Sequence, residues 1–277
     1  MKRYQRGVIA LLLMTLMLPA LAQQTKTVTI LQTSDMHSRI EPIDKNTADK
    51  YAGMGGLVRR ATLIKQLRQE VPGLLLFDSG DFSQGTPYYN MFRGEIEVKM
   101  MNQMGYDAIT IGNHEFDFGM DNMARLFKLA TFPIVCANYD VRGTVLEGLV
   151  NPYVLLERNG LKIGVFGLSP QLEGLVQADK CEGVVYKDPV LTANEIVAQL
   201  KDQEQCDVVI CLSHMGYEYD KKQLIPQTEY IDAVLGGHSH TFMNEVEMIP
   251  NRAGKSVSLQ HSGKSGIYIN RTDITVK

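Results

Sequence analysis

The sequence has few features that would suit a partner carrying a large negative charge. Its formal net charge is −3 at pH 7, and its basic residues do not gather in clusters. A mildly acidic chain of this kind argues against a protein that wraps duplex nucleic acid or binds an anionic membrane surface. The composition leaves open a small phosphorylated substrate, because metal ions attract such a molecule locally.

Cysteine is scarce as well, and its spacing excludes two kinds of site. The four cysteines are Cys136, Cys181, Cys206 and Cys211. No two of them form a C-x-x-C pair, so the sequence indicates neither a thiolate zinc site nor a redox motif. We expect buried free thiols, although an exported protein could form disulfides.

The N-terminus carries an apolar run that is too short to span a membrane comfortably. The run covers residues 7–18, residues 20–22 are Ala-Leu-Ala, and the basic residues before the run are Lys2, Arg3 and Arg6. This pattern predicts a secretory signal peptide over residues 1–22, cleaved after Ala22. The alternative is a retained anchor, which would need roughly 20 apolar residues.

Cleavage would leave residues 23–277 as an exported chain, periplasmic or secreted, with no membrane anchor. Its net charge would be −6, because the segment removed holds three basic residues and no acidic one. The remaining chain is long enough for one domain with a well-buried core. We find no repeat, low-complexity tract or linker, and therefore expect a single domain.

Short β-branched runs alternate with helical patterns along this chain. The predicted helices are 57–67, 95–104, 120–129 and 189–200, the last with Asp188 as N-cap and Pro189 at its first position. The predicted strands are 27–31, 74–77, 108–111, 134–137, 162–167, 207–212, 233–235, 256–260 and 267–276. The alternation favours a layered α/β fold. The last two strands have no helix between them, which predicts an antiparallel ending.

Polar segments follow five of the predicted strands. They are Thr33-Ser34-Asp35-Met36-His37, Ser79-Gly80-Asp81, Gly112-Asn113-His114-Glu115, Ser213-His214-Met215-Gly216 and Gly236-Gly237-His238-Ser239-His240. Ligands of α/β sheets bind outside the carboxyl ends of the strands. Five of the six histidines occur in these segments, so we interpret them as one site and not as unrelated core or surface residues.

The residue types in these segments suit metal binding. Carboxylate, imidazole and amide ligands without thiolates favour Zn, Mn, Fe, Co or Mg. The candidates are Asp35, His37, Asp81, Asn113, His214, His238 and His240. Seven ligands exceed the needs of one catalytic ion and suit two, as in phosphatases and nucleases. Asp35 and His37 are two residues apart, as are His238 and His240, so on an extended backbone each pair would project from one face.

The set Asp35-x-His37, Gly80-Asp81, Gly112-Asn113-His114-Glu115, His214 and Gly237-His238-x-His240 resembles the calcineurin-like metallophosphoesterase superfamily. The longer strings Gly112-Asn113-His114-Glu115-Phe116-Asp117 and Gly236-Gly237-His238-Ser239-His240-Thr241 are similar to its 5′-nucleotidase branch. The resemblance covers nearly the whole chain after the expected cleavage point. It implies an α/β sandwich of mixed sheets flanked by helices, acting as a phosphoester hydrolase.

The resemblance also implies how two divalent ions would be held. One would be bound by Asp35, His37, Asp81 and His240. The other would be bound by Asp81, Asn113, His214 and His238, with Asp81 bridging. A hydroxide between the ions would attack phosphorus. Asp78 is a competing carboxylate, for which we expect hydrogen bonding near the ligands instead of metal binding.

Two further residues receive catalytic roles from the same resemblance. His114 would face the phosphoryl group and stabilise its charge or protonate the leaving oxygen, and Asp117 would orient His114. Metal binding requires neither residue. Their presence together argues against a non-catalytic metal-binding relic, which is the alternative outside enzyme chemistry.

The leading functional hypothesis is a 5′-nucleotidase-like phosphomonoesterase acting on a small phosphorylated substrate, in particular a nucleotide. A phosphodiesterase acting on cyclic nucleotides is the alternative within the same chemistry. The resemblance extends to the metal domain alone. A separately encoded protein resembling the C-terminal nucleoside-binding domain could therefore be a partner. Local loops could instead complete the pocket, with Tyr88, Tyr217 and Tyr219 as candidates.

Overall fold

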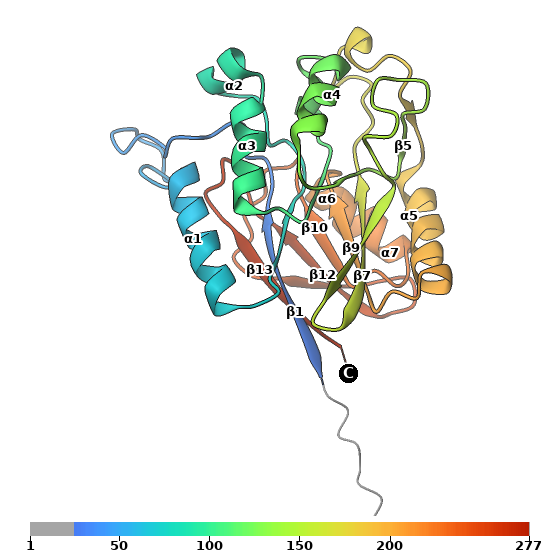
Figure 1. Cartoon of the computed structure of the whole chain (residues 1–277). Helices are drawn as coiled ribbons and strands as arrows, with labels where there is room; N and C mark the ends of the chain where they lie inside the picture. Colours follow the sequence, from blue (N-terminus) through green and yellow to red (C-terminus); the bar gives the residue numbers. More distant parts are fainter. Residues whose placement is uncertain (1–24, 277) are drawn as a thin grey trace, which may run out of the picture.

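The computed structural model describes residues 25–276 and shows two β-sheets packed face to face between helices (Figure 1). The α/β class with mixed sheets flanked by helices is thus confirmed. The predicted signal peptide lies outside the described residues.

The first sheet has five strands in the order β13-β1-β2-β3-β4. Their bounds are β1 Lys26–Thr33, β2 Leu75–Asp78, β3 Ala108–Thr110, β4 Ile134–Val135 and β13 Asn270–Val276. Strands β1 to β4 run parallel, and β13 pairs antiparallel with β1 at the sheet edge. The carboxyl ends of β1, β2 and β3 therefore lie side by side.

The second sheet has six strands in the order β11-β12-β10-β9-β7-β6. Their bounds are β6 Tyr153–Arg158, β7 Leu161–Leu168, β9 Val208–Ser213, β10 Ala233–Gly236, β11 Glu247–Pro250 and β12 Ser256–His261. Strands β7, β9, β10 and β12 are parallel, whereas β6 and β11 are antiparallel edges. A small third sheet pairs β5 Tyr139–Asp140 with β8 Val185–Tyr186.

The predicted antiparallel ending is wrong, because the last two strands belong to different sheets. Strand β12 pairs with β10 and β11, whereas β13 pairs with β1. Residues 262–269 carry the chain from one sheet to the other. Each of the two strands finds an antiparallel neighbour, but neither neighbour is the other strand.

Helices cover the outer face of each sheet (Figure 1). On the first sheet they include α1 Leu57–Glu70, α3 Glu95–Met104 and α4 Met120–Leu129, and α2 Pro87–Phe92 precedes α3. On the second sheet the main helix is α5 Pro189–Ala198, continued by η3 Gln199–Gln203. The remaining short turns are η1 His114–Phe116, η2 Ala178–Lys180, α6 Tyr217–Tyr219, η4 Asp220–Leu224 and α7 Ile225–Gln227.

Alternate side chains of the strands fill different layers of the core. In β2, Leu75 and Phe77 pack between the two sheets, and Leu76 packs under the helices of the first sheet. In β9, Ile210 lies between the sheets and Cys211 under α5. Because both faces of these strands are buried, their sequences are continuous apolar runs. The polar segments can face solvent only where the strands end.

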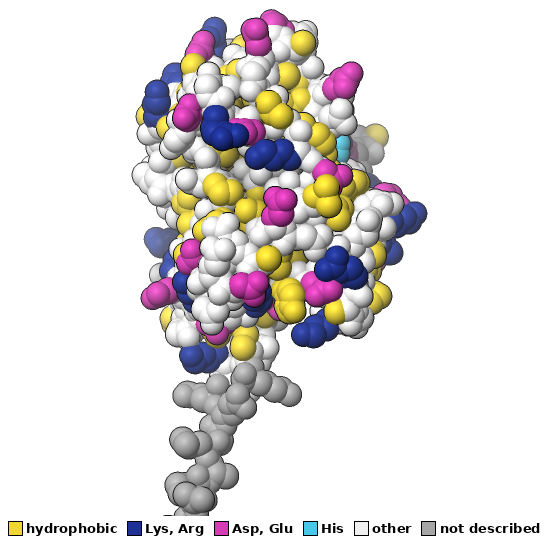
Figure 2. All heavy atoms as spheres, turned by 90° about the vertical axis from the view of Figure 1, so that its right-hand side faces the viewer, with side chains coloured by type: hydrophobic (Ala, Val, Ile, Leu, Met, Phe, Trp, Pro, Cys, Tyr) yellow, Lys and Arg dark blue, Asp and Glu magenta, His cyan; other side chains and the backbone are white. Residues whose placement is uncertain are grey.

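None of the four cysteines, which all lie in the described part, forms a disulfide. Cys136, Cys206 and Cys211 are buried and Cys181 is partly exposed. No helix within residues 25–276 has the length and apolar composition needed to cross a membrane. On the face shown in Figure 2, acidic and basic side chains are interspersed.

Candidate metal centre

The five polar segments converge where the carboxyl ends of the strands of both sheets meet. Three overlapping groups of side chains place their ligand atoms within 4.8 Å of one another. The groups are Asp35-His37-His240, His37-Asp81-His114 and Asp81-His214-His238. The first sheet supplies Asp35, His37, Asp81 and His114, and the second supplies His214, His238 and His240. The site therefore lies between the sheets.

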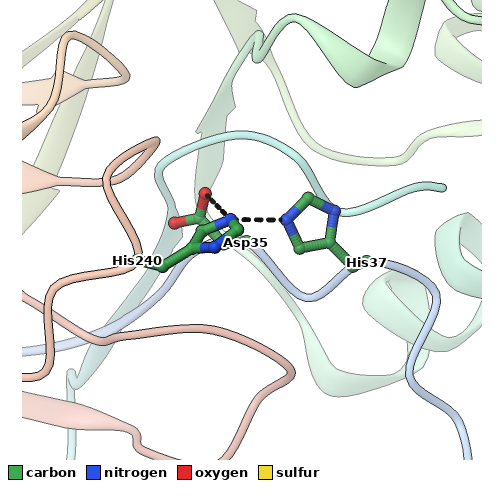
Figure 3. Close-up of side chains that lie close together, drawn as sticks. All are labelled: Asp35, His37 and His240. Carbon is green, nitrogen blue, oxygen red and sulfur yellow. Dashed lines mark hydrogen bonds and ion pairs between the residues drawn. The ribbon is translucent and has the colours of Figure 1, made fainter. Parts of the chain in front are cut away.

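In the first group, His240 lies between the other two side chains (Figure 3). Its Nε2 atom is 2.9 Å from Nε2 of His37 and 3.6 Å from Oδ1 of Asp35. The expectation that Asp35 and His37 meet because they lie on one face of an extended backbone is wrong. The backbone is left-handed at Asp35 (φ 49°) and His37 (φ 46°), so a turn, not an extended strand, brings the two side chains together.

In the group of Asp81, His214 and His238, His214 Nε2 is 3.0 Å from Oδ2 of Asp81, although the two are not aligned as a hydrogen bond. The other ring nitrogen of His214 donates to the Ser79 carbonyl at 2.6 Å, which orients the imidazole. His238 joins this group and His240 the first. The prediction that these two histidines share a face is therefore wrong, because His238 has a left-handed backbone (φ 71°).

Asp81 is common to two of the three groups, and its carboxylate is 2% exposed. Its Oδ1 atom accepts the backbone N–H of His114 at 2.9 Å, and its Oδ2 atom faces His214. The Asp81 carboxylate thus connects the group of His37 and His114 with the group of His214 and His238.

The donor set fits divalent cations on observations of the side chains themselves. Among the candidate ligands, three buried side-chain atoms have no hydrogen-bond partner: Asn113 Oδ1, His37 Nδ1 and His214 Nε2. Asp35 and Asp81 are buried carboxylates, and within residues 25–276 neither forms an ion pair with a lysine or arginine. Buried carboxylates and unpartnered polar atoms are costly unless they are paired or bind metal.

The protonation states of the imidazoles also fit the binding of divalent cations. Burial lowers the pKa of His37 and His238 to about 4, and it also lowers that of His240. These rings are neutral at pH 7 and can offer lone pairs to a metal. Burial alone would lower the pKa of His214, but the Asp81 carboxylate outweighs it and raises the pKa to about 10. A divalent cation bound to Asp81 and His214 would supply the positive charge that the extra proton on His214 supplies in its absence.

Strained backbone concentrates at these residues. Five of the candidate ligands have positive φ angles, namely Asp35, His37, Asp81, His238 and His240. Non-glycine residues in this region cost about 1–3 kcal/mol each and cluster at functional sites. Gly112 permits the close approach of the loops, because a Cβ there would lie 2.1 Å from Asp81 Oδ1.

Sequence reasoning gave no role to Glu115, which holds two of the loops together. Its Oε2 atom accepts the backbone N–H groups of Asp81 (3.0 Å) and Gly112 (2.7 Å), and its Oε1 atom accepts the Ser83 hydroxyl at 3.1 Å. The side chain is buried. Its place in the motif, two residues after Asn113, was the only sequence signal.

Two other buried acids support the site from behind. Asp78 accepts hydrogen bonds from the Thr33 hydroxyl (2.7 Å) and the Gly80 N–H (3.1 Å), and it belongs to none of the three groups. Asp220 accepts the Ser213 hydroxyl at 2.5 Å and lies 3.0 Å from His261 Nε2. His261, to which the sequence assigned nothing, is thus a buried partner of the segment that precedes His214.

His114 belongs to the group of His37 and Asp81, and one of its ring nitrogens is already engaged. Its Nδ1 atom lies 3.0 Å from Asp117 Oδ2, and this hydrogen bond raises the pKa of the imidazole. Both side chains are about one-third exposed, at 32% and 35%. The ring can therefore face a substrate while Asp117 fixes its orientation.

The tyrosines proposed for the pocket make other contacts. Tyr88 donates to Glu41 at 3.0 Å. Tyr217 donates to Glu247 at 2.6 Å and packs edge-on against His261, and Tyr219 packs on the core of the second sheet.

Comparisons with known proteins identify the family of this chain. The model of the calcineurin-like phosphoesterase family matches residues 28–242. The 5′-nucleotidase of Bos taurus is 35% identical over 223 residues, 78% of this chain and 38% of the bovine protein. A trifunctional nucleotide phosphoesterase protein of Bacillus subtilis is 31% identical over 261 residues, 83% of this chain and 18% of that protein.

A solved structure gives the same result for the fold. The 5′-nucleotidase precursor of Thermus thermophilus superposes with a TM-score of 0.84 at 29% identity, covering 90% of this chain and 51% of that one. This chain thus spans about half or less of the length of these relatives.

Proposed function

The chain belongs to the calcineurin-like phosphoesterase family, and we propose that it is an exported phosphomonoesterase, similar to 5′-nucleotidases, that uses two divalent ions. Membership and the 5′-nucleotidase relatives make it a metal-dependent phosphoester hydrolase. The observation that carries the finer proposal is the position of Asp81, whose carboxylate lies within ligand distance of His37 in one group and of His214 and His238 in another.

The proposed division is based on the group of Asp35, His37 and His240 and on the group of Asp81, His214 and His238. Asn113 is added because its buried Oδ1 atom has no hydrogen-bond partner. Asp35, His37 and His240 would hold one ion, His214, His238 and Asn113 the other, and Asp81 both. Such an ion pair, of Zn, Mn, Fe, Co or Mg, lowers the pKa of a bound water and neutralises charge on a phosphoryl group.

The protein's own residues would complete the reaction centre. Asp117 holds His114 through Nδ1, which leaves Nε2 to donate to a phosphoryl oxygen or to the leaving oxygen. Because the hydrogen bond to Asp117 raises the pKa of His114, the protonated ring is available nearer to neutral pH. Glu115 keeps Asp81 in place through the backbone of both strand-end loops.

The test is a substrate panel on the metal-loaded mature chain. We expect hydrolysis of phenyl phosphate and AMP with a higher kcat/KM than that of cyclic AMP. A higher value for cyclic AMP would favour the diesterase alternative. Asp81→Asn should abolish activity. Asp232→Asn is the matched control, since Asp232 lies at the other end of β10 and accepts only the Val209 N–H with its side chain.

Export and a partner protein are finer parts of the proposal. Intact mass of protein from its native host should correspond to a chain that starts at Gln23, and an uncleaved N-terminus would contradict export. The idea of a separately encoded nucleoside-recognising protein is not supported by any of the described contacts. It would gain support if the chain alone showed no preference for AMP over phenyl phosphate.

A further inference from the structure

The imidazole of His261 is a buried group that the proposed reaction does not use. His261 is 1% exposed and ends β12, and it belongs to none of the three ligand groups. Its Nε2 atom lies 3.0 Å from Oδ2 of Asp220, and because a carboxylate only accepts hydrogen bonds, Nε2 donates. Oδ1 of Asp220 accepts the Ser213 hydroxyl at 2.5 Å. The ring is therefore linked by one carboxylate to the residue that precedes His214.

His261 also touches the segment that leads to His238. Strand β12 runs parallel to β10, and His261 is the register partner of Gly236, the last residue of β10. A Cβ at Gly236 would lie 2.0 Å from Nε2 of His261, so a side chain there would displace the ring from Asp220. Gly236 thus gives the ring room to contact β10 and Asp220 at the same time.

A third contact of the ring involves Tyr217, three residues beyond His214. The Tyr217 ring packs edge-on against His261, with centroids 5.7 Å apart and an interplanar angle of 83°. The backbone N–H of Tyr217 donates to the Ser239 hydroxyl at 3.0 Å. Ser239 lies in the chain between the other two candidate histidine ligands of the second sheet. The segment after His214 is in this way held against the segment that carries those two histidines.

The backbone between His214 and Asp220 has an unusual conformation. Gly216 has a φ angle of 92°, and α6 passes directly into the π-helical turn η4, of which Asp220 is the first residue. The Asp220 N–H donates to the Gly216 carbonyl at 3.0 Å. π-Helical turns are rare, and they often occur at functional sites. This turn directs the Asp220 carboxylate inward, to Ser213 and His261.

A displacement of Ser213 would reach two candidate ligands at once. Ser213 precedes His214, and its carbonyl accepts the N–H of Gly237, the residue before His238, at 2.8 Å. Removal of a group that orients metal ligands from behind typically weakens metal binding by about 10–100-fold. Because His261 is buried, it cannot contact a substrate, and its effect on the reaction would pass through these ligands.

We call the ion assigned to Asp81, Asn113, His214 and His238 the second ion. We propose that His261 is a positioning residue for the second ion. Its ring fixes the spacing of the ends of β9 and β10, from which the two histidines reach Asp81. This proposal rests on the proposed function and adds to it the residue that sets this spacing. The other ion takes only one histidine from the second sheet, so it depends less on His261.

The experiment measures the affinity for Zn²⁺, by competition with a chelator, in the full mature chain carrying His240→Ala, which should retain the second ion alone. His261→Leu and Ser213→Ala should each weaken this affinity by about 10–100-fold, the range for loss of an orienting partner. His261→Gln keeps an N–H donor and should retain most of the affinity. Ser213→Ala removes one small group, so it remains informative if His261→Leu does not fold. An unchanged affinity in either variant, when folded, would overturn the proposal.

Thr272→Val is the matched control for the loss of a buried hydrogen bond. The Thr272 hydroxyl donates to Oε1 of Gln260 at 2.6 Å, and Gln260 is the neighbour of His261 on β12. Thr272→Val should lower the midpoint of urea unfolding and leave the affinity for the second ion unchanged. An equal loss of affinity in this variant would mean that His261 acts through general stability, and it would overturn the proposal.

Binding of Zn²⁺ to the wild-type chain separates failure of this proposal from failure of the proposed function, because it requires no substrate. If the wild-type chain binds two ions and His261→Leu keeps both affinities, the positioning role is overturned and the proposed function stands. In the His214→Ala chain, which lacks a ligand of the second ion, His261→Leu should leave the affinity for the other ion nearly unchanged. Equal weakening of both ions would overturn the proposal. A wild-type chain that binds fewer than two ions would contradict the proposed function and this proposal with it.

Discussion

The Nε2 atoms of His37 and His240 lie 2.9 Å apart, although 203 residues separate them in the chain. Burial lowers the pKa of both rings, so neither is expected to carry a second proton at pH 7. Two neutral imidazoles that face each other in this way, beside Asp35, are suited to share one cation.

This relationship predicts a graded loss of metal among variants. The wild-type chain should bind about two divalent ions, as phosphatase-type metal pairs do. His240→Ala should retain about one, and Asp81→Ala fewer, because only Asp81 belongs to both proposed sets. Elemental analysis after gel filtration measures the content, and chelation followed by re-addition of Zn or Mn tests reversibility. A single ion in active wild type, with Asp35→Ala fully active, would contradict the prediction.

The His114–Asp117 pair predicts a loss of rate without a loss of metal. His114→Ala should lower kcat by about 10²–10⁴-fold, the usual contribution of a general acid–base group. Asp117→Asn should have a smaller effect, because the His114 ring remains. Its orientation would be less fixed, and its pKa would lose the rise caused by the Asp117 carboxylate. Elemental analysis should give the wild-type metal content for both variants. Loss of metal from His114→Ala would mean that His114 is a ligand.

The donors around Glu115 predict a structural role for this carboxylate. Glu115→Gln replaces one accepting oxygen by an NH₂ group that faces N–H or hydroxyl donors. We expect a loss of about 2 kcal/mol in the free energy of unfolding, within the range for leaving a buried hydrogen-bond donor without its partner. Urea unfolding of chelated protein measures it without the contribution of metal binding. An unchanged midpoint would show that the contacts to Asp81 and Gly112 contribute little.

Asp232 predicts a pH-dependent difference in stability far from the metal centre. Burial raises its pKa above the ordinary value of 3.8. The folded chain therefore holds this proton more tightly than the unfolded chain. The resulting stability is present below pH 3.8 and is lost as the pH rises through the folded-state pKa.

Asp232→Asn removes this ionisation. The stability of the variant relative to the wild type should therefore increase from acidic to neutral pH. Urea unfolding of both chains from about pH 4 to about pH 8 measures the difference, in which effects of metal loss cancel. The exposed Asp202→Asn serves as the control and should show no such trend. If the stability of Asp232→Asn relative to the wild type instead fell toward neutral pH, burial would not raise the pKa of Asp232.

The sequence predicted the elements whose residues carry a strong local signal. Helices α3 and α4 begin and end as expected, and the Asp188 side chain caps α5 by accepting the Leu191 N–H at 2.8 Å. The edge strands β6 and β11 were missed. Their side chains are mostly half-exposed. Pro250 ends β11, which shows no clear apolar run, and the apolar run of β6 is short and is followed by the charged Glu157 and Arg158.

The convergence of the site could be predicted, but its internal arrangement could not. Strand-end residues of parallel strands meet at one edge, which follows from the α/β pattern. Whether His238 or His240 approaches Asp35 depends on left-handed turns and on two sheets packing face to face. Neither is encoded in local spacing. Residue spacing therefore gave a wrong reason for the proximity of Asp35 and His37. It also placed His238 and His240 wrongly on one face.

The pairing of β1 with β13 has a consequence for the order in which the protein becomes active. Synthesis proceeds from the N-terminus, and domains fold as their residues emerge from the ribosome. Asp35 and Asp81 emerge early, but His238 and His240 follow only when most of the chain has been made, and β13 comes last. A nascent or truncated chain that stops before residue 238 would lack ligands from two of the three groups. Phosphatase activity would therefore require a chain that extends past residue 240 and whose two sheets have packed against each other.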